Sequence, residues 1–282
     1  MSATTMNHDD FSDTALGKRS AAVSQYTPSL LFPIDRSRVR AQLGVRAEEL
    51  PFFGADLWTA WELTWLDRDG KPEVGVLQVR VPCESRAIVE SKSLKLYLGS
   101  FAQTPFASAY DVVRTLESDL SVTVGAQVVV DLLSLNQVTQ AGVSGLMGES
   151  LDSIRIASPV YHPDAALLER IETGRMVTET VHTNLFRSLC PVTGQPDMAS
   201  VQISYTGPRI EHEDLLRYLV SYRDHPGFHE YCVEKIFLDL MERCRPRELS
   251  VSARFLRRGG IDINPFRSTG KIMPAVVRLV RQ

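Results

Sequence analysis

Residues 90–105 read ESKSLKLYLGSFAQTP, and residues 211–226 read EHEDLLRYLVSYRDHP. At a spacing of 121 positions, the two stretches agree at seven places in identity or in chemical kind. In the first stretch these places are Glu90, Leu94, Tyr97, Leu98, Ser100, Phe101 and Pro105, and in the second Glu211, Leu215, Tyr218, Leu219, Ser221, Tyr222 and Pro226. A match at fixed spacing indicates that one structural unit occurs twice.

The repeat extends to both sides of these stretches. Upstream, residues 70–73 (Gly-Lys-Pro-Glu) lie 124 positions before residues 194–197 (Gly-Gln-Pro-Asp), and downstream residues 120–122 lie 129 before residues 249–251. The order is preserved, and loop insertions account for the small changes in spacing.

Each copy is predicted to form a hairpin, two helices and further strands. In the first copy, apolar runs at 57–66 and 74–81 flank a turn at 67–70, helical spacing follows around 94–101 and 110–116, and 122–135 returns to strand character. The second copy predicts strands at 178–186 and 198–205, helices at 211–223 and 229–244, and a strand at 249–255. The expected fold class is α+β, with antiparallel sheets that carry helix pairs on one face.

Three segments follow from this pattern. Residues 1–45 are polar and then interrupted by Pro28 and Pro33, so we expect an N-terminal arm that lies across a partner or stays mobile, with no chemistry of its own. Residues 46–165 form the first module and residues 166–282 the second.

Composition excludes some classes of protein. With 282 residues and 44% hydrophobic content the chain can bury a core, and 31 Lys and Arg against 34 Asp and Glu give no overall attraction to nucleic acid or an anionic membrane. No stretch reaches the about 18 apolar residues of a membrane span, and residues 1–13 lack a signal-peptide core, so we expect a cytoplasmic protein without a membrane partner. The basic run after residue 250 is typical of a solvated face, with phosphate binding as the alternative.

The four cysteines, Cys83, Cys190, Cys232 and Cys244, show neither disulfide-framework nor zinc-ligand spacing. We therefore expect reduced thiols and no bound metal.

The segment 190–197 (Cys-Pro-Val-Thr-Gly-Gln-Pro-Asp) is the strongest sign of chemistry. It predicts a rigid, exposed turn between two strands that presents its side chains outward, with the thiol of Cys190 and the carboxyl of Asp197 on one loop. A soft nucleophile beside a proton carrier suits covalent attack on an electrophilic carbon. The alternative is a buried cysteine and an aspartate that caps a turn.

The two copies differ in their polar residues. Asp67 stands near the place of Cys190, Phe106-Ala107-Ser108 corresponds to Phe228-His229-Glu230, and the segment 90–93 (Glu-Ser-Lys-Ser) is replaced by Glu-His-Glu-Asp. Each half has kept part of a shared site, or the halves have drifted apart.

Four motifs together resemble one family. The segments 90–98, 190–197, 228–230 and 257–262 (Arg-Arg-Gly-Gly-Ile-Asp), in this order, resemble QueF, the NADPH-dependent 7-cyano-7-deazaguanine reductases of queuosine biosynthesis, in their two-module form. The resemblance runs from about residue 15 to the C-terminus. It implies tandem tunnelling-fold (T-fold) modules, a homodimer, and reduction of a nitrile on a small 7-deazapurine to a primary amine with two NADPH, without direct contact to nucleic acid.

The resemblance also implies roles for residues. Cys190 would form a thioimide with the nitrile carbon, and Asp197 would protonate the nitrogen, for which it must hold a proton at neutral pH. The expected substrate contacts are Val89, Glu90, Ser91, Phe228, His229 and Glu230, and the expected NADPH contacts are Ser91, Lys92, Arg258 and Gly259. Because the chain has no G-x-G-x-x-G motif after a strand, a Rossmann site for the cofactor is not expected.

The same residues could also have purely structural roles. Glu90 and Glu230 could be carboxylates favoured by a helix N-terminus, His229 a structural histidine, and Lys92 and Arg258 surface cations. A cysteine-dependent nitrile hydrolase and a non-catalytic purine-binding module are the alternative functions. The residues alone do not decide NADPH over NADH, the dimer geometry, or the pKa values of Cys190 and Asp197.

Overall fold

The computed structural model describes residues 23–157, 160–274 and 276–282. The strands are β1 (Pro33–Asp35), β2 (Phe53–Leu66), β3 (Pro72–Pro82), β4 (Ala87–Val89), β5 (Val129–Leu133), β6 (Glu149–Ser150), β7 (Ile171–Leu189), β8 (Pro196–Ile210), β9 (Glu248–Phe255) and β10 (Ile261–Ser268). The helices are α1 (Arg36–Arg40), α2 (Ser91–Gly99), α3 (Ala109–Val124), α4 (Leu135–Ala141), α5 (His212–Val220) and α6 (His229–Cys244). The predicted α+β class, with an antiparallel sheet and helix pairs, is confirmed.

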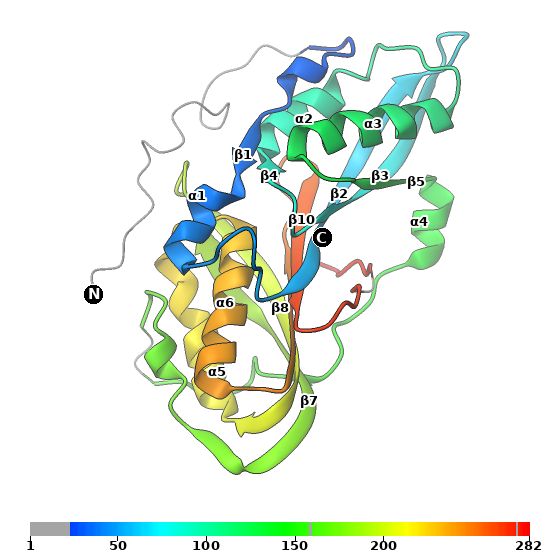
Figure 1. Cartoon of the computed structure of the whole chain (residues 1–282). Helices are drawn as coiled ribbons and strands as arrows, with labels where there is room; N and C mark the ends of the chain where they lie inside the picture. The colour runs from blue at the N-terminus through cyan, green and yellow to red at the C-terminus, as the bar shows by residue number, and fades with distance from the viewer. Residues whose placement is uncertain (1–22, 158–159, 275) are drawn as a thin grey trace.

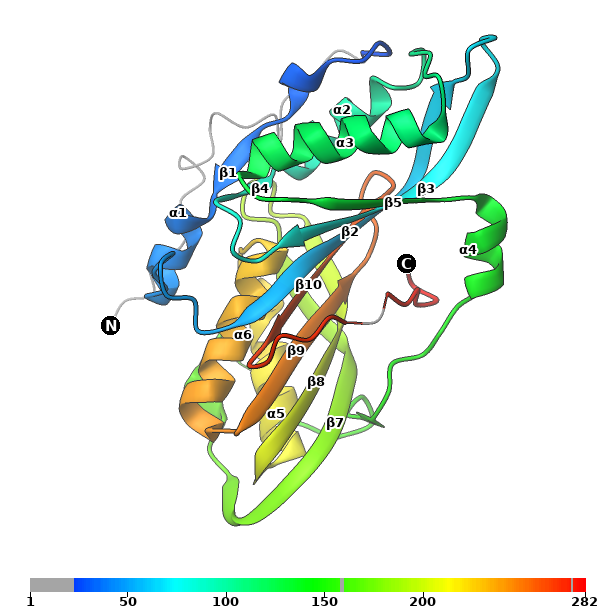
Figure 2. The same ribbon diagram turned by 45° about the vertical axis from the view of Figure 1, so that its right-hand side comes forward.

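One long sheet runs through both halves of the chain. Its eight strands lie in the order β5-β3-β2-β10-β9-β8-β7-β6, antiparallel except for the short pair β6 and β7. The pair α2 and α3 covers the part formed by the first half, and α5 and α6 cover the part formed by the second half, on the same side (Figures 1 and 2). The two sheets expected from the repeat are thus joined edge to edge.

The join is a seam between β2 and β10. Eight residue pairs are in register, from Ile261 opposite Ala60 to Ser268 opposite Phe53. The strands approach closely at Gly54, where an added Cβ would lie 2.0 Å from the carbonyl oxygen of Phe266. Only glycine fits this contact, because any side chain would displace the partner backbone.

Equivalent contacts in the two halves explain the repeat. Leu66 forms a parallel bridge with Pro105 at the end of the first hairpin, and Leu189 forms the same bridge with Pro226 in the second. These leucines immediately precede Asp67 and Cys190, so the two residues occupy corresponding places.

Each half has its own apolar core, and a tyrosine ties its two helices together. Tyr97 on α2 donates to Asp119 on α3 at 2.6 Å, and Tyr218 on α5 donates to Asp239 on α6 at 2.6 Å. Both tyrosine rings are buried. Buried phenols keep their packing only when the hydroxyl finds a partner, which explains why this tyrosine recurs in the repeat.

The segment 122–135 was predicted as a strand, and this was wrong at both ends. Helix α3 continues through Val124 and stops at Gly125, whose φ of 69° is the left-handed conformation of a helix C-cap. Only Val129–Leu133 is strand, and Leu135 begins α4. Valines such as Val122, which is 79% exposed on α3, favoured the strand prediction.

Part of the predicted N-terminal arm packs on its own chain, and its contact with a partner stays a prediction. Strand β1 pairs with β4, and α1 lies beside α6 in both views (Figures 1 and 2). Residues 1–22 of the predicted arm lie outside the described residues. Within the described part of the chain, none of the helices combines the length and apolar character needed to cross a membrane.

Candidate active site

A cavity of about 320 Å³ lies between the two halves of the chain. Its wall includes every residue for which the sequence predicted a role, namely Val89, Glu90, Ser91, Lys92, Cys190, Asp197, Phe228, His229, Glu230, Arg258 and Gly259. The first four come from β4 and the start of α2 in the first half, and the other seven from the second half. The fold therefore brings the divided polar residues together in one place.

Cys190 opens the short loop between β7 and β8. Its backbone N–H donates to the carbonyl of Gln195 at 2.8 Å, and the N–H of Gly194 donates to the Cys190 carbonyl at 2.9 Å. Gly194 has a φ of 66°, which such a tight turn requires. Residues 193–196 are exposed as predicted for this turn, but the expectation that it presents the Cys190 side chain outward was wrong, because only 5% of Cys190 is exposed and its side chain lines the cavity.

Asp197, at the start of β8, lies between the guanidinium of Arg258 and the imidazole of His229. Arg258 Nη1 lies 2.8 Å from Asp197 Oδ1, and His229 Nε2 lies 3.4 Å from Oδ2. Burial would raise the pKa of the Asp197 carboxyl, but His229 and Arg258 together hold that pKa below its usual 3.8. This direction argues against the expectation that Asp197 holds a proton at neutral pH, because the contacts with His229 and Arg258 outweigh burial.

Arg258 faces the nucleophile as well. Burial lowers the pKa of its guanidinium, but Asp197 and then the Cys190 side chain bring that pKa above its usual value. Arg258 Nη2 also donates to Gln195 Oε1 at 2.7 Å, which fixes the guanidinium over the loop. Arg258 therefore contacts both members of the proposed catalytic pair, Cys190 and Asp197. Its side chain is half-buried in the cavity wall.

His229 and Glu230 begin α6 beside this pair. The His229 ring stacks on Phe255, with ring centroids 3.7 Å apart and planes 3° apart, so the imidazole is fixed edge-on to Asp197. Glu230 is 5% exposed, and burial followed by the charge of Asp56 raises the pKa of its carboxyl. The charges of His229 and then Arg36 lower the pKa of the Glu230 carboxyl.

Three cavity-lining residues carry a buried polar atom with no hydrogen-bond partner among the described residues. These atoms are Trp58 Nε1, His229 Nδ1 and Glu230 Oε1. Buried polar atoms without a partner cost free energy, and binding sites are where such atoms are kept. The cavity therefore suits a ligand with both hydrogen-bond donors and acceptors.

Glu90 caps α2 from the other side. Its carboxylate accepts from the backbone N–H groups of Lys92 at 2.7 Å and Ser93 at 2.8 Å. Burial nevertheless raises the pKa of Glu90 above its usual value. The helix-terminus interpretation of Glu90 thus describes its local contacts, and the Ser91 side chain adds a further hydrogen bond to this carboxylate, which also lines the cavity.

The cavity also has a cationic side near the turn between β9 and β10. Lys92, Lys95 and Arg258 line it, and Gly259 has a φ of 63°. A Cβ at Gly259 would lie 2.8 Å from Lys95 Nζ, so the glycine leaves room that a larger residue would fill. These features fit the phosphates of NADPH. The sequence analysis missed Lys95, although its position one helical turn after Ser91 was a usable signal.

The described residues contain no group of three or more His, Cys, Asp and Glu side chains arranged to hold a metal. The four cysteines are all buried and unpaired in disulfides.

Comparison with known proteins decides the family. Residues 22–132 match a family model described as "Nitrile reductase, 7-cyano-7-deazaguanine-reductase N-term", and residues 196–273 match one described as "QueF-like protein". A "NADPH-dependent 7-cyano-7-deazaguanine reductase" of Paraburkholderia phytofirmans is 52% identical over 268 residues, which cover 95% of this chain and 97% of the relative. The chain belongs to this family. The predicted family is confirmed, and with it an oxidoreductase that depends on NADPH.

Other 7-cyano-7-deazaguanine reductases match equally well. Proteins with the same name from Burkholderia lata and Paraburkholderia phymatum are 52% and 51% identical, each with 95% of this chain and 97% of the relative covered. Among solved structures, an archaeosine synthase QueF-Like in the apo form matches with a TM-score of 0.30 and 18% identity, over 34% of this chain and 95% of that one.

Proposed function

We propose that the chain reduces the nitrile of 7-cyano-7-deazaguanine to the primary amine, in queuosine biosynthesis, through a thioimide formed on Cys190. The observation that carries this proposal is the single cavity that joins Cys190 and Asp197 of the second half to Glu90 and Lys92 of the first. Family membership supports the reaction, and the arrangement of side chains supports the covalent route.

In the first step the Cys190 thiol adds across the carbon–nitrogen triple bond. Sulfur bonds to carbon, one π bond breaks, and the nitrogen takes a proton. Because its contacts lower the pKa of Asp197, the carboxylate accepts the thiol proton and then delivers it to the nitrogen. Arg258, which faces both side chains, stabilises the negative charge as it passes between them.

Two reductions complete the reaction. NADPH supplies a hydride for each, so one nitrile, two NADPH and two protons give one amine and two NADP⁺. Between the reductions the carbon–sulfur bond breaks, its electron pair returns to Cys190, and the free imine stays in the cavity. The imine must be kept from water until the second hydride arrives, which requires the cavity to be closed at that stage.

The polar atoms of the cavity match the edge of the deazaguanine ring. Glu230 Oε1 is a free acceptor for the adjacent N–H and amino groups of the ring, and Glu90 offers a second carboxylate. We place Val89, Ser91, Phe228 and His229 around the rest of the substrate. Ser91, Lys92, Arg258 and Gly259 would contact NADPH.

The adduct is the direct test of this mechanism. Intact-protein mass spectrometry after mixing with 7-cyano-7-deazaguanine, without NADPH, should show a gain equal to one intact nitrile molecule. Cys190→Ala should show no gain, whereas Cys244→Ala, which removes another buried thiol, should still form the adduct. An adduct on Cys190→Ala, or none on the wild-type protein, would refute the thioimide.

Product analysis separates reduction from the alternatives. Loss of NADPH absorbance should be twice the loss of nitrile. Formation of an amide or acid without NADPH would favour a hydrolase, and binding without turnover would favour a purine-binding module.

Three further points belong to this proposal. The chain would act as a cytoplasmic homodimer on a free small molecule, with no nucleic acid bound. The arm, residues 1–45, and the modules, 46–165 and 166–282, would be its structural units, which the matching bridges of Leu66 and Leu189 support. Sedimentation equilibrium should give twice the chain mass, and a monomer mass would contradict the dimer.

A further inference from the structure

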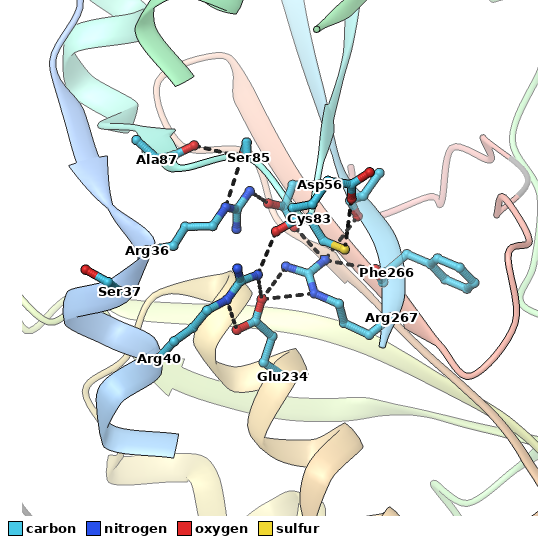
Figure 3. Close-up of polar contacts among 12 residues, drawn as sticks. Arg36, Ser37, Arg40, Asp56, Cys83, Ser85, Ala87, Glu234, Phe266 and Arg267 are labelled. Atoms are coloured by element: carbon cyan, nitrogen blue, oxygen red, sulfur yellow. Dashed lines mark hydrogen bonds and ion pairs between the residues drawn. The ribbon is translucent and has the colours of Figure 1, made fainter. Parts of the chain in front are cut away.

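Figure 3 shows a buried network of ion pairs formed by Arg36, Arg40, Asp56, Glu234 and Arg267. Arg36 on α1 pairs with Asp56 on β2 at 2.5 Å, and Arg267 on β10 pairs with Asp56 at 2.8 Å and with Glu234 on α6 at 2.7 Å. Arg40 on α1 pairs with Glu234 at 2.7 Å. All five side chains are at most 5% exposed.

The network reaches the cavity through α6. Glu234 lies one helical turn after Glu230, and both carboxylates share with Arg36 and Arg40 a second, small cavity of about 10 Å³. Glu230 thus lies between the substrate cavity on one side and the network on the other. Its Oε1 has no hydrogen-bond partner among the described residues.

The charges of the network do not balance without Glu230. Three guanidinium groups, those of Arg36, Arg40 and Arg267, face two carboxylates, those of Asp56 and Glu234. One positive charge is left over, and the Glu230 carboxyl, which lines the small cavity together with Arg36 and Arg40, would compensate it when ionised. Buried charges are stable only when compensated in this way.

Arg36 is the cation of this network that acts on Glu230. Burial and the charge of Asp56 raise the pKa of the Glu230 carboxyl, whereas His229 and then Arg36 lower it. Arg36 also neutralises Asp56 directly, and its Nε donates to Ser85 Oγ at 3.0 Å, so the guanidinium is fixed from two sides. The other titratable or charged groups that line the substrate cavity are Glu90, Lys92, Lys95, Cys190, Asp197 and Arg258.

We propose that Arg36, from the N-terminal segment, is a positioning residue for substrate recognition, which keeps Glu230 ionised so that it can accept both donors of the deazaguanine ring. This inference rests on the proposed function, because it assumes that Glu230 contacts the substrate. The proposal assigns the N-terminal segment, through Arg36, a role in substrate binding that the sequence of this segment does not indicate.

The test is the pH dependence of substrate binding. In a Cys190→Ala background, which prevents the adduct, calorimetry gives the dissociation constant of 7-cyano-7-deazaguanine at several pH values. Arg36→Gln should weaken binding about tenfold at neutral pH, and the affinity should recover as the pH rises by about one to two units, since one pKa unit changes the ionised fraction tenfold. Arg36→Lys should restore most of the affinity. Arg38→Gln, an exposed neighbour on α1, should bind like the parent.

Two outcomes would overturn the inference. One is an unchanged affinity of Arg36→Gln at every pH, and the other is a loss that is equal at every pH, which a merely structural role would give. If Glu230→Gln binds 7-cyano-7-deazaguanine as tightly as the parent protein does, the proposed contact between Glu230 and the substrate is also wrong. If Glu230→Gln fails to bind while Arg36→Gln is unaffected, only the inference fails.

Further variants keep the test valid if Arg36→Gln does not fold. Asp56→Asn removes the anion that raises the pKa of Glu230, so binding should persist to lower pH than in the parent. The double variant Arg36→Gln/Asp56→Asn removes a cation and an anion together and should return the pH dependence to that of the parent. If the pH dependence of substrate binding in Asp56→Asn shifts to higher pH, or does not shift, the inference is contradicted.

Discussion

At the scale of single residues, the charge of Asp197 is the main correction that the structure makes. Its position on one loop with Cys190 is visible in the sequence, but its partners lie 32 and 61 positions further along the chain. Spacing cannot reveal that two cations converge on one carboxylate. Burial was foreseeable and would have raised the pKa, whereas the ion pairs with His229 and Arg258 lower it.

Asp197→Asn should lower kcat by about 10²- to 10⁴-fold while substrate still binds, because the amide cannot carry the thiol proton to the nitrogen. Glu73→Gln is the matched control, since Glu73 holds the same place in the first copy and lies outside the cavity. Steady-state kinetics and calorimetry measure the two quantities. Equal losses in both variants would contradict the role of Asp197.

The lowered pKa of Asp197 also predicts the acid limit of activity. The carboxylate stays ionised as the pH falls, until the pH passes its folded pKa, which lies below 3.8. Protonation of Asp197 should therefore not reduce kcat/KM until the pH is below about 4. In Arg258→Gln one cation is lost, the pKa of Asp197 rises, and this acid limb should move to higher pH.

At the scale of elements, the duplicated pattern predicted the structure well where both copies kept it. Helix α6 has the bounds that were predicted, and the hairpin of β2 and β3 turns at residues 67–70 as expected. Prediction failed where only one copy has the element, as with α4 and β10. Strand β10 contains Asp262, Asn264 and Arg267, which are polar residues that read as exposed but are buried.

The turn between β9 and β10 offers a test of the NADPH side of the cavity. Gly259→Ala should raise the KM for NADPH severalfold with little change in the KM for the nitrile, because its Cβ would displace Lys95. Gly260→Ala is the control, since Gly260 also has a positive φ, 87°, but its Cβ would meet nothing within 4 Å. If both variants behave alike, backbone strain alone explains the effect.

At the scale of the whole molecule, the buried ion pairs tie the N-terminal segment and both halves together. The sequence suggested that the basic residues after position 250 form a solvated face, yet Arg267 is 0% exposed and Arg254 is 5% exposed. The partners of Arg267, Asp56 and Glu234, lie 211 and 33 positions away. Only the folded chain brings these charges together, so the sequence pattern could not show them.

Removal of one partner should therefore be costly. Arg267→Gln should lower the free energy of unfolding by about 3–5 kcal/mol at neutral pH, because it leaves buried carboxylates uncompensated. Arg247→Gln, whose pair with Glu248 is exposed, should cost at most about 1 kcal/mol. Urea denaturation measures both, and similar small losses would show that the network adds no stability.

The same network should make stability depend on acid. Burial raises the pKa values of Asp56 and Glu234, but nearby arginines, Arg267 most of all, lower them more. The pKa of Asp56 therefore lies below its usual 3.8, and the pKa of Glu234 lies below its usual 4.5. A lowered folded pKa stabilises the protein above the unfolded value, and this stability is lost as the pH falls through the folded value. The difference in the free energy of unfolding between the wild-type protein and Arg267→Gln should therefore become smaller below about pH 4.5.

The seam between β2 and β10 has a consequence for synthesis on the ribosome. Strand β2 can pair with β3 early, but its other neighbour, β10, is complete only after more than two hundred further residues have been made, and loop closure over such a separation is slow. Until Ser268 has left the exit tunnel, one edge of β2 stays open to unwanted pairing. Catalytic competence thus has to wait until β10 has been made and has paired with β2.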